Sequence, residues 1–204
     1  MQEMWHESID SVSLRRAAPP GYATSKRVWS TGQQQHYGGV AIIHRSEYKQ
    51  AKMTSLPKVN SFEYVCTRLH TVQVGVLVIA SIYRPGSVAV TSDFFKELTT
   101  FLESLASYRC PIVLLGDFNI HTKRQDDVHS KKLAELLASF DLKQHLDEAT
   151  HNLSGCLDFV VIRSDFFVND LQVVEVGFSD HYLVTCRLPT SPPVAGTVPV
   201  EGRK

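Results

Sequence analysis

Carboxylates and a histidine stand beside apolar runs in three separate segments of the sequence. Together with one amide, these residues are Asp117, Asn119, Asp158, Asp180 and His181. A carboxylate buried beside a strand is costly unless something pairs with it, so three carboxylates from distant segments indicate a shared partner. A divalent cation such as Mg²⁺ takes oxygen ligands, and histidine gives or takes a proton near neutral pH. The set therefore predicts metal-assisted hydrolysis of a phosphodiester.

Each member of this set also has a purely structural interpretation. Asp117 and Asn119 belong to the sequence Asp-Phe-Asn, which is common in turns. Asp180 and His181 could form a surface ion pair, and Asp158 could face solvent from an edge strand. The complete set, in this order and at the ends of predicted strands, favours chemistry over these alternatives.

The apolar run Ile112–Leu115 predicts a buried strand that leads directly into the first polar pair. Gly116 interrupts the run at a point where the backbone turns or passes close to another group. Because Asp117 and Asn119 are two residues apart, an extended chain would point both side chains to the same face. The pattern predicts a charge and an amide together at the end of the strand.

Hydrophobic periodicity predicts the elements that position these side chains. The predicted strands are Val40–His44, Phe62–Leu69, Val72–Tyr83, Ile112–Leu115, Cys156–Ile162, Leu171–Val176 and Tyr182–Leu188. The predicted helices are Thr91–Tyr108, capped by Thr91 or Ser92, and Ser130–Phe140. The loop-like stretches are Ser8–Pro20 and Lys26–Gln35. Strands with two helices among them predict an α/β domain of packed sheets flanked by helices.

The composition favours no highly charged partner. The 204 residues are 43% hydrophobic, which is enough for one core and predicts one domain. Lys+Arg and Asp+Glu number 21 each, so binding to nucleic acid would need a local basic patch. Neither a long apolar run nor a signal-peptide core occurs, so we expect an intracellular protein without a membrane partner. The four scattered cysteines predict reduced thiols.

Several segments carry a resemblance to a known family. They are S-I-Y-R-P-G (Ser81–Gly86), L-L-G-D-F-N-I-H (Leu114–His121), T-H-N-L-S-G-C-L-D-F-V (Thr150–Val160), F-S-D-H-Y-L-V (Phe178–Val184) and G-G-V-A-I (Gly39–Ile43). With them the chain resembles the endonuclease/exonuclease/phosphatase superfamily, and within it the apurinic-endonuclease-like nucleases of non-LTR (LINE-type) retrotransposons. The resemblance implies a four-layer α/β sandwich, in which two packed, mostly antiparallel β-sheets are flanked by helices.

The resemblance also implies a role for each catalytic residue. Asp117 resembles the aspartate that activates the attacking water or protonates the leaving group, and Asn119 the residue that orients it. His181 resembles the histidine that contacts the scissile phosphate, and Asp158 the carboxylate that holds its imidazole. Tyr83 resembles the tyrosine that contacts the phosphate.

Substrate-binding and metal-binding residues follow from the same resemblance. Thr150 and Ser179, together with Asn119, match polar groups that contact the substrate. Asp180 matches an aspartate near the metal, which is expected to be Mg²⁺ or Mn²⁺. Glu3 is the second expected metal ligand, because Glu3-Met4-Trp5 fits the last three positions of the family's Thr-Glu-Thr-Trp segment.

One departure from the family lies at the start of the sequence. Members of the family begin with a strand that ends in an asparagine, upstream of the glutamate segment. This sequence starts at Met1, so we expect an N-terminally truncated domain over residues 1–189 that lacks the first strand. Residues 190–204 are rich in Pro, Thr, Val and Gly without periodicity, and we expect a disordered tail or linker there.

The expected activity is nicking of one strand of double-stranded DNA, which leaves a 3′-hydroxyl that primes reverse transcription. We expect a monomeric domain, nuclear if it acts on genomic DNA. A full-length element would add a reverse transcriptase domain, which does not follow in this sequence. One alternative is a weak or inactive remnant. Another is a phosphatase acting on inositol phosphates, or a lipid phosphodiesterase, because the same scaffold hosts these activities.

Overall fold

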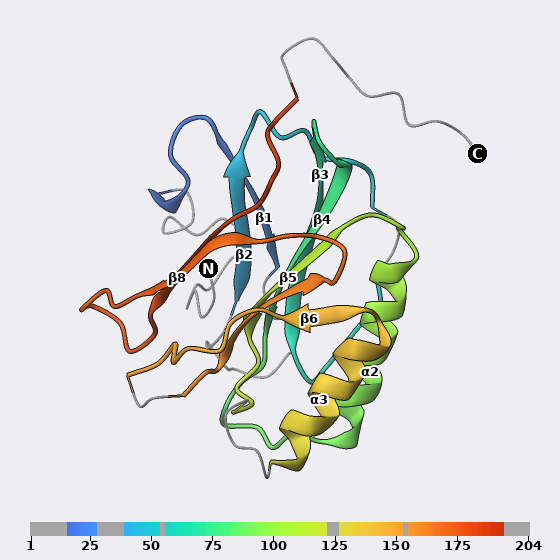
Figure 1. Ribbon diagram of the computed structural model, residues 1–204, viewed down its shortest axis with the longest axis vertical. Coiled ribbons are helices and arrows are strands. Elements are labelled where there is room, and N and C mark those ends of the chain that lie inside the picture. The colour runs from blue at the N-terminus through green and yellow to red at the C-terminus, as the bar shows by residue number, and fades with distance from the viewer. Residues whose placement is uncertain (1–15, 28–38, 54–55, 122–126, 153–154, 194–204) are drawn as a thin grey trace.

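A computed structural model describes residues 16–27, 39–53, 56–121, 127–152 and 155–193 of the chain. Figure 1 shows strands at the centre and two long helices side by side at one flank. The elements are β1 (Tyr22–Arg27), β2 (Val40–Arg45), β3 (Glu63–Thr71), β4 (Gly75–Tyr83), α2 (Ser92–Ala106), β5 (Ile112–Asp117), α3 (Val128–Ser139), β6 (Leu142–Gln144), β7 (Asp158–Arg163), β8 (Asn169–Val174) and β9 (Leu183–Arg187).

A five-stranded sheet in the order β3-β4-β5-β7-β6 forms the centre of the fold. Only β4 and β5 run parallel, and α2 connects them, as a crossover between parallel strands requires. The other three pairs are antiparallel. This mixed α/β architecture, with mostly antiparallel pairing, confirms the fold class predicted from the sequence.

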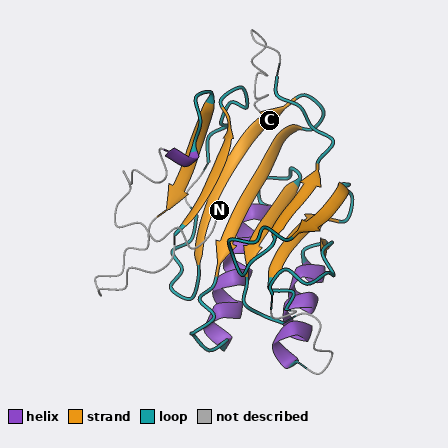
Figure 2. Ribbon diagram, turned by 90° about the vertical axis from the view of Figure 1, so that its left-hand side faces the viewer, coloured by secondary structure: helices purple, strands orange, loops and turns teal. Residues whose placement is uncertain are grey.

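Both helices cover the same face of the five-stranded sheet (Figure 2). Helix α2 begins where the Thr91 hydroxyl accepts a hydrogen bond from the Phe94 amide, which identifies Thr91 as the cap. Its buried stripe packs on alternate residues of the strands, as the two periodicities require. The contacting residues include Phe94, Leu98, Phe101 and Leu105 of α2, Leu133 and Leu137 of α3, and Val78, Ile82, Leu114 and Val161 of the sheet.

The opposite face of the sheet packs against two separate β-ribbons, β1–β2 and β8–β9. Val40 of β2 contacts Val65 and Tyr83, while Val173 and Val184 of the second ribbon pack against the cluster formed by β4, β5 and β7. The described layers are therefore a helix pair, the five-stranded sheet and these ribbons.

The register of the sheet places four polar side chains in one row on the ribbon-facing side. Glu63 pairs with Tyr83, Tyr83 with Asp117, and Asp117 with Asp158, from β3 across to β7. Directly paired residues point to the same face of a sheet, so the row carries three carboxylates and a phenol. Next to it, Gly116 has φ 149°, and a Cβ there would lie 2.0 Å from the Ile82 carbonyl oxygen. Only glycine lets β5 approach β4 this closely at the end of the strand.

Two short strands fall outside the predicted set. The end of β1, Lys26 and Arg27, was expected to be loop because the stretch is polar, but it pairs antiparallel with β2. Strand β6 pairs with β7. It has only three residues, which is too few for a periodic hydrophobic signal. The strand predicted from Val72 begins at Gly75, because the intervening residues form the turn of the β3–β4 hairpin.

The C-terminal end of the described chain is tied to that hairpin turn. The amide of Val72 donates to the Ser191 carbonyl at 3.0 Å, and the Ser191 amide donates to Gln73 Oε1 at 2.7 Å. Ser191 belongs to the segment expected to be a tail or linker, so the first part of that segment packs on the domain. Residues 194–204 lie outside the described part of the chain.

All four cysteines are free, as the sequence predicts; they are Cys66, Cys110, Cys156 and Cys186. Within the described ranges, neither helix combines the length and apolar character needed to cross a membrane.

Candidate functional site

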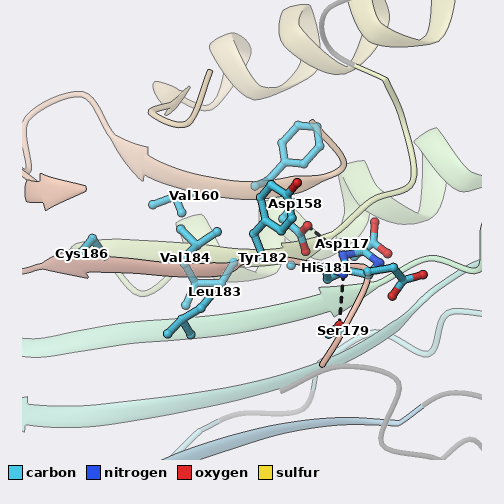
Figure 3. A pocket seen from close by; sticks show the side chains of 13 residues that line it. Asp117, Asp158, Val160, Ser179, His181, Tyr182, Leu183, Val184 and Cys186 are labelled. Atoms are coloured by element: carbon cyan, nitrogen blue, oxygen red, sulfur yellow. Dashed lines mark hydrogen bonds and ion pairs between the residues drawn. The ribbon is translucent and has the colours of Figure 1, made fainter. Parts of the chain in front are cut away.

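A cleft of about 450 Å³ opens between the ends of β5 and β7 and the segment that precedes β9 (Figure 3). Its polar lining comes from Asp117, Asp158, Ser179, Asp180 and His181, and Val160 and Val184 line its apolar side. The structure thus gathers five predicted site residues, from three distant parts of the sequence, into one cleft.

Asp117 and Asn119 form the tightest polar pair of the site. The Asn119 amide donates to Asp117 Oδ1 at 2.8 Å, and its side-chain Nδ2 donates to Asp117 Oδ2 at 2.7 Å. Asn119 has φ 49°, so the strand has already ended and the chain turns back. The predicted proximity is therefore correct, but a left-handed turn brings the side chains together rather than alternation along a strand. Two donors on one buried carboxylate fix its orientation.

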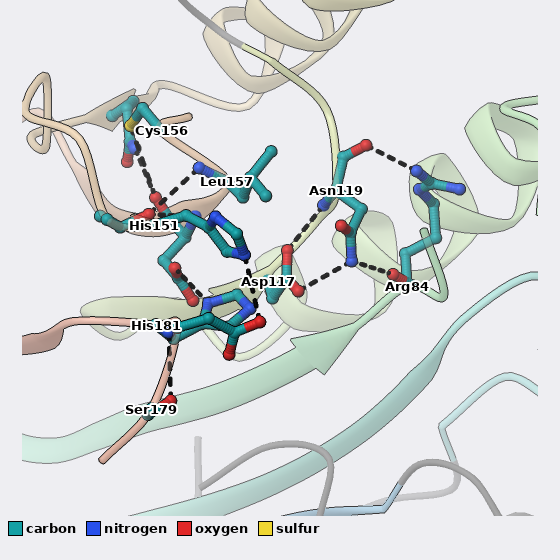
Figure 4. A network of polar contacts seen from close by, with 12 residues as sticks. Arg84, Asp117, Asn119, His151, Cys156, Leu157, Ser179 and His181 are labelled. Carbon is teal, nitrogen blue, oxygen red and sulfur yellow. Dashed lines mark hydrogen bonds and ion pairs between the residues drawn. The ribbon is translucent and has the colours of Figure 1, made fainter. Parts of the chain in front are cut away.

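Arg84 supports the turn of the candidate site, and the sequence analysis did not single it out. Arg84 is 3% exposed, and its guanidinium donates to the Phe118 carbonyl oxygen at 2.6 Å. It also donates to the Asn119 carbonyl oxygen at 2.6 Å (Figure 4). It also donates to the carbonyls of Pro85 and Val88. The side chain therefore joins the loop after β4 to the turn that carries the Asp117–Asn119 pair.

Asp158 and His181 form the second pair. Their closest atoms, His181 Nδ1 and Asp158 Oδ2, are 3.1 Å apart, and both side chains are largely buried. The hydrogen bond to Asp158, acting against burial and together with the charges of Asp158, Asp117 and Asp180, raises the pKa of His181 to about 9. The imidazole is thus held as a cation at neutral pH, with its second nitrogen available to the cleft.

Replacing Asp158 with asparagine should lower the pKa of His181 well below about 9, because the largest cause of its elevation is lost. The pKa is higher than the 6.5 of an unfolded chain, so the pair stabilises the fold fully below pH 6.5 and loses its effect as pH rises through about 9. An NMR titration of the His181 ring would measure the change. The exposed ion-pair variant Asp165→Asn is the control, and an unchanged midpoint in Asp158→Asn would contradict the assignment.

Thr150 and Ser179 support this pair from both sides. The Thr150 hydroxyl oxygen is fully buried and accepts hydrogen bonds from the amides of Leu157 and Asp158, at 3.1 and 3.2 Å. Ser179 Oγ accepts a hydrogen bond from the His181 amide at 3.1 Å. Both residues position the ion pair in this structure, and their predicted contacts with substrate stay predictions.

His151 is a second residue that the sequence analysis did not single out. Its Nε2 lies 3.4 Å from Asp180 Oδ2, and its ring meets the His181 ring edge-on at 5.0 Å between centroids. Burial acts to raise the pKa of Asp180, but its own backbone amide and the two histidines hold that pKa below its usual value. The only sequence signal for His151 is its place next to Thr150, because the contact with His181 forms only when the chain folds.

Tyr83 and Glu3 complete the predicted set. Tyr83 stands beside Asp117 in the sheet register, with a buried ring that packs against Val40 and Val65. Glu3 lies outside the described residues, so its role as a metal ligand stays a prediction.

Among the described residues, one group of three side chains offers metal donors, and two of them line the cleft. His151, Asp180 and His181 each offer one donor atom, and these atoms lie within 4.8 Å of one another. Asp180 is the predicted Mg²⁺ ligand that the structure describes, and its exposed carboxylate suits a hard cation. The two imidazoles beside it suit borderline ions better than Mg²⁺.

Comparison with known proteins agrees with this fold. Similar solved structures include the endonuclease domain of TRAS1, a telomere-specific non-LTR retrotransposon, with a TM-score of 0.64 at 14% identity, covering 83% of this chain and 80% of that one. An endonuclease/exonuclease/phosphatase from Beutenbergia cavernae DSM 12333 has a TM-score of 0.59 at 16% identity, covering 90% of this chain and 57% of that one. ANGEL2, a 2′,3′-cyclic phosphatase, has a TM-score of 0.56 at 12% identity, covering 87% of this chain and 68% of that one.

No curated protein matches the chain. Residues 1–181, however, match the Endonuclease/Exonuclease/phosphatase family, and this range holds every residue of the predicted site. The chain therefore belongs to the endonuclease/exonuclease/phosphatase family.

Proposed function

We propose that the chain is a metal-dependent phosphodiester hydrolase that nicks one strand of double-stranded DNA. The observation that carries the proposal is the convergence of two pairs, Asp117–Asn119 and Asp158–His181, on one cleft. One pair offers an oriented carboxylate and the other a held imidazolium, which are the two groups needed on either side of a phosphate.

In this reaction Asp117 is the group that exchanges a proton with the attacking water or the leaving oxygen. Both of its oxygens are held by Asn119, so the carboxylate is already oriented before substrate arrives. Arg84 fixes the same turn through the Asn119 carbonyl, which keeps the proton-transfer group in place.

His181 is the group that stabilises the phosphate. Its Nδ1 is held by Asp158, which leaves the other ring nitrogen to donate toward a phosphate oxygen. A cation preorganised in this way is most valuable where negative charge develops in the transition state. Because the pKa of His181 is raised to about 9, activity that depends on the imidazolium should persist at neutral pH and decline as pH rises through that value.

Enzymes of this family generally use divalent metal ions. A divalent ion held by Asp180, with Glu3 as the expected second ligand, would supply positive charge to the phosphate. The chain's own contribution at this position is an exposed carboxylate, whose pKa is lowered by its own backbone amide and by the neighbouring histidines.

Duplex DNA is proposed as substrate because the motifs resemble retrotransposon nucleases and the TRAS1 endonuclease domain shares the fold. A phosphatase is the second candidate, because ANGEL2, named as a 2′,3′-cyclic phosphatase, shares the fold with a similar TM-score. The same oriented carboxylate and imidazolium would serve either reaction, so substrate decides between the two candidates.

We expect the protein to convert supercoiled plasmid to the open circular form in the presence of Mg²⁺ or Mn²⁺. Chelation by EDTA should abolish this nicking, and so should Asp117→Asn, which removes the proton-transfer group. Gel electrophoresis of plasmid, run beside phosphate release from inositol phosphates and a 2′,3′-cyclic nucleotide, would measure both candidates. Metal-dependent phosphate release without plasmid nicking would replace the endonuclease proposal with the phosphatase.

A further inference from the structure

We propose that His151, Asp180 and His181 form a binding site for a borderline transition-metal ion such as Zn²⁺. The donor atoms of the three side chains lie within 4.8 Å of one another, and His151 Nε2 is already 3.4 Å from Asp180 Oδ2. Two imidazoles and one carboxylate are the donor set that such ions bind in proteins, with a further position left for water. The site differs from the predicted Glu3–Asp180 site in its nitrogen ligands.

The backbone holds the two donor segments side by side. His151 and His181 form an antiparallel bridge, and the Tyr182 amide donates to the Thr150 carbonyl at 2.8 Å. The Asn152 amide also donates to the Asp180 carbonyl, at 2.9 Å. These bonds fix the separation of the two histidines before any ion arrives, so little ordering is left for metal binding.

One of the donor separations already suits a bound ion. Four tetrahedral ligands at about 2.0–2.1 Å from an ion lie about 3.3–3.4 Å from one another. The His151–Asp180 distance of 3.4 Å already meets this geometry. The other donor separations are at most 4.8 Å, so side chains, including the 65% exposed Asp180 side chain, must rotate to bring all three donors to this spacing.

A supporting carboxylate is present behind the site. Asp158 Oδ2 contacts His181 Nδ1 at 3.1 Å, and the Asp158 amide is in turn held by the Thr150 hydroxyl. Histidines that bind metal usually donate their other ring N–H to a carboxylate in this manner, which fixes the ring orientation. Asp158 therefore directs the other ring nitrogen of His181 toward the cleft, and an ion that binds there displaces the proton from that nitrogen into solvent.

This site shares Asp180 and His181 with the proposed catalytic cleft. An ion bound there would occupy the imidazole that is proposed to contact the phosphate, so Zn²⁺ should inhibit the Mg²⁺-dependent reaction. That consequence rests on the proposed function, whereas metal binding itself does not. Binding is therefore measured first, and inhibition is measured separately.

The test uses the whole chain, with Zn²⁺ titration calorimetry and the visible absorption of Co²⁺ as probes. We expect one equivalent to bind, and His151→Gln to weaken binding at least about tenfold, because even supporting groups cost 10–100-fold. Asp180→Asn, at an exposed position, should weaken binding as well. The control is His129→Gln, at the exposed start of α3, which should bind as the wild type does.

Equal Zn²⁺ affinity in wild type, His151→Gln and Asp180→Asn, with circular dichroism showing all three folded, would overturn the site, as would no binding to the wild type. Site-dependent Zn²⁺ binding by a protein without nicking activity would support the site and contradict the proposed function alone. Binding together with Zn²⁺ inhibition that His151→Gln relieves would support both.

Discussion

Replacing His181 with alanine is expected to reduce strand nicking by about 10²–10³-fold, on the order of 3–4 kcal/mol of transition-state stabilisation. The imidazolium is held by Asp158 and lines the cleft, so its loss removes a preorganised cation from the proposed phosphate site. Product appearance in a plasmid-nicking time course measures the effect, and circular dichroism checks that the fold is kept.

The matched control is His129→Ala, which removes an imidazole from an exposed position at the start of α3. That variant should nick at the wild-type rate. If His181→Ala nicks as fast as the wild type in the presence of Mg²⁺, the activity does not come from this cleft, and the assignment of His181 is wrong.

Residue types predicted which side chains meet at the cleft, but they did not predict how those side chains meet. Asp117 and Asn119 were expected to meet because an extended chain would put both on one face. In the structure they meet because Asn119 adopts φ 49° just after the strand ends. Hydrophobic periodicity encodes neither the left-handed turn at Asn119 nor the close approach of β5 to β4 at Gly116.

Residues that act by holding others were the ones missed. Arg84 follows the predicted strand in the sequence Arg-Pro-Gly, where it is typical of a loop, yet its guanidinium binds main-chain carbonyls distant in sequence. Every residue has a main-chain carbonyl, so the residue types do not show which carbonyls will accept a hydrogen bond. No sequence pattern could therefore have indicated this contact. His151 is similar, since its partners Asp180 and His181 approach only through a strand-like bridge.

The elements were predictable to the extent that they carry their own periodic signal. Helix α2 has a continuous apolar stripe, and its predicted bounds differ from the observed ones by two residues or fewer. Strand β6 is three residues long, and β1 is polar, so pairing with a neighbour rather than local sequence defines both. The row from Glu63 to Asp158 needs the register of four strands, which a single sequence does not specify.

Replacing Arg84 with methionine is expected to lower the free energy of unfolding by about 3–5 kcal/mol, although the substitution keeps most of the buried volume. The guanidinium is 3% exposed and donates to four carbonyl oxygens, those of Phe118, Asn119, Pro85 and Val88. Burial lowers the pKa of Arg84, against the opposite effect of Asp117, so the cation relies on these acceptors.

Methionine has no donors, and each buried carbonyl left without a partner costs roughly 1–3 kcal/mol unless water replaces the guanidinium. The same loss frees the turn that carries the Asp117–Asn119 pair, so nicking should also fall at temperatures where the variant is still folded. Urea denaturation measures the stability, and the plasmid assay measures the activity.

Arg187→Met is the control, because Arg187 is 77% exposed and its ion pair with Asp170 should contribute less than about 1 kcal/mol. Equal urea midpoints for Arg84→Met and Arg187→Met would show that the buried guanidinium does not hold the two loops together.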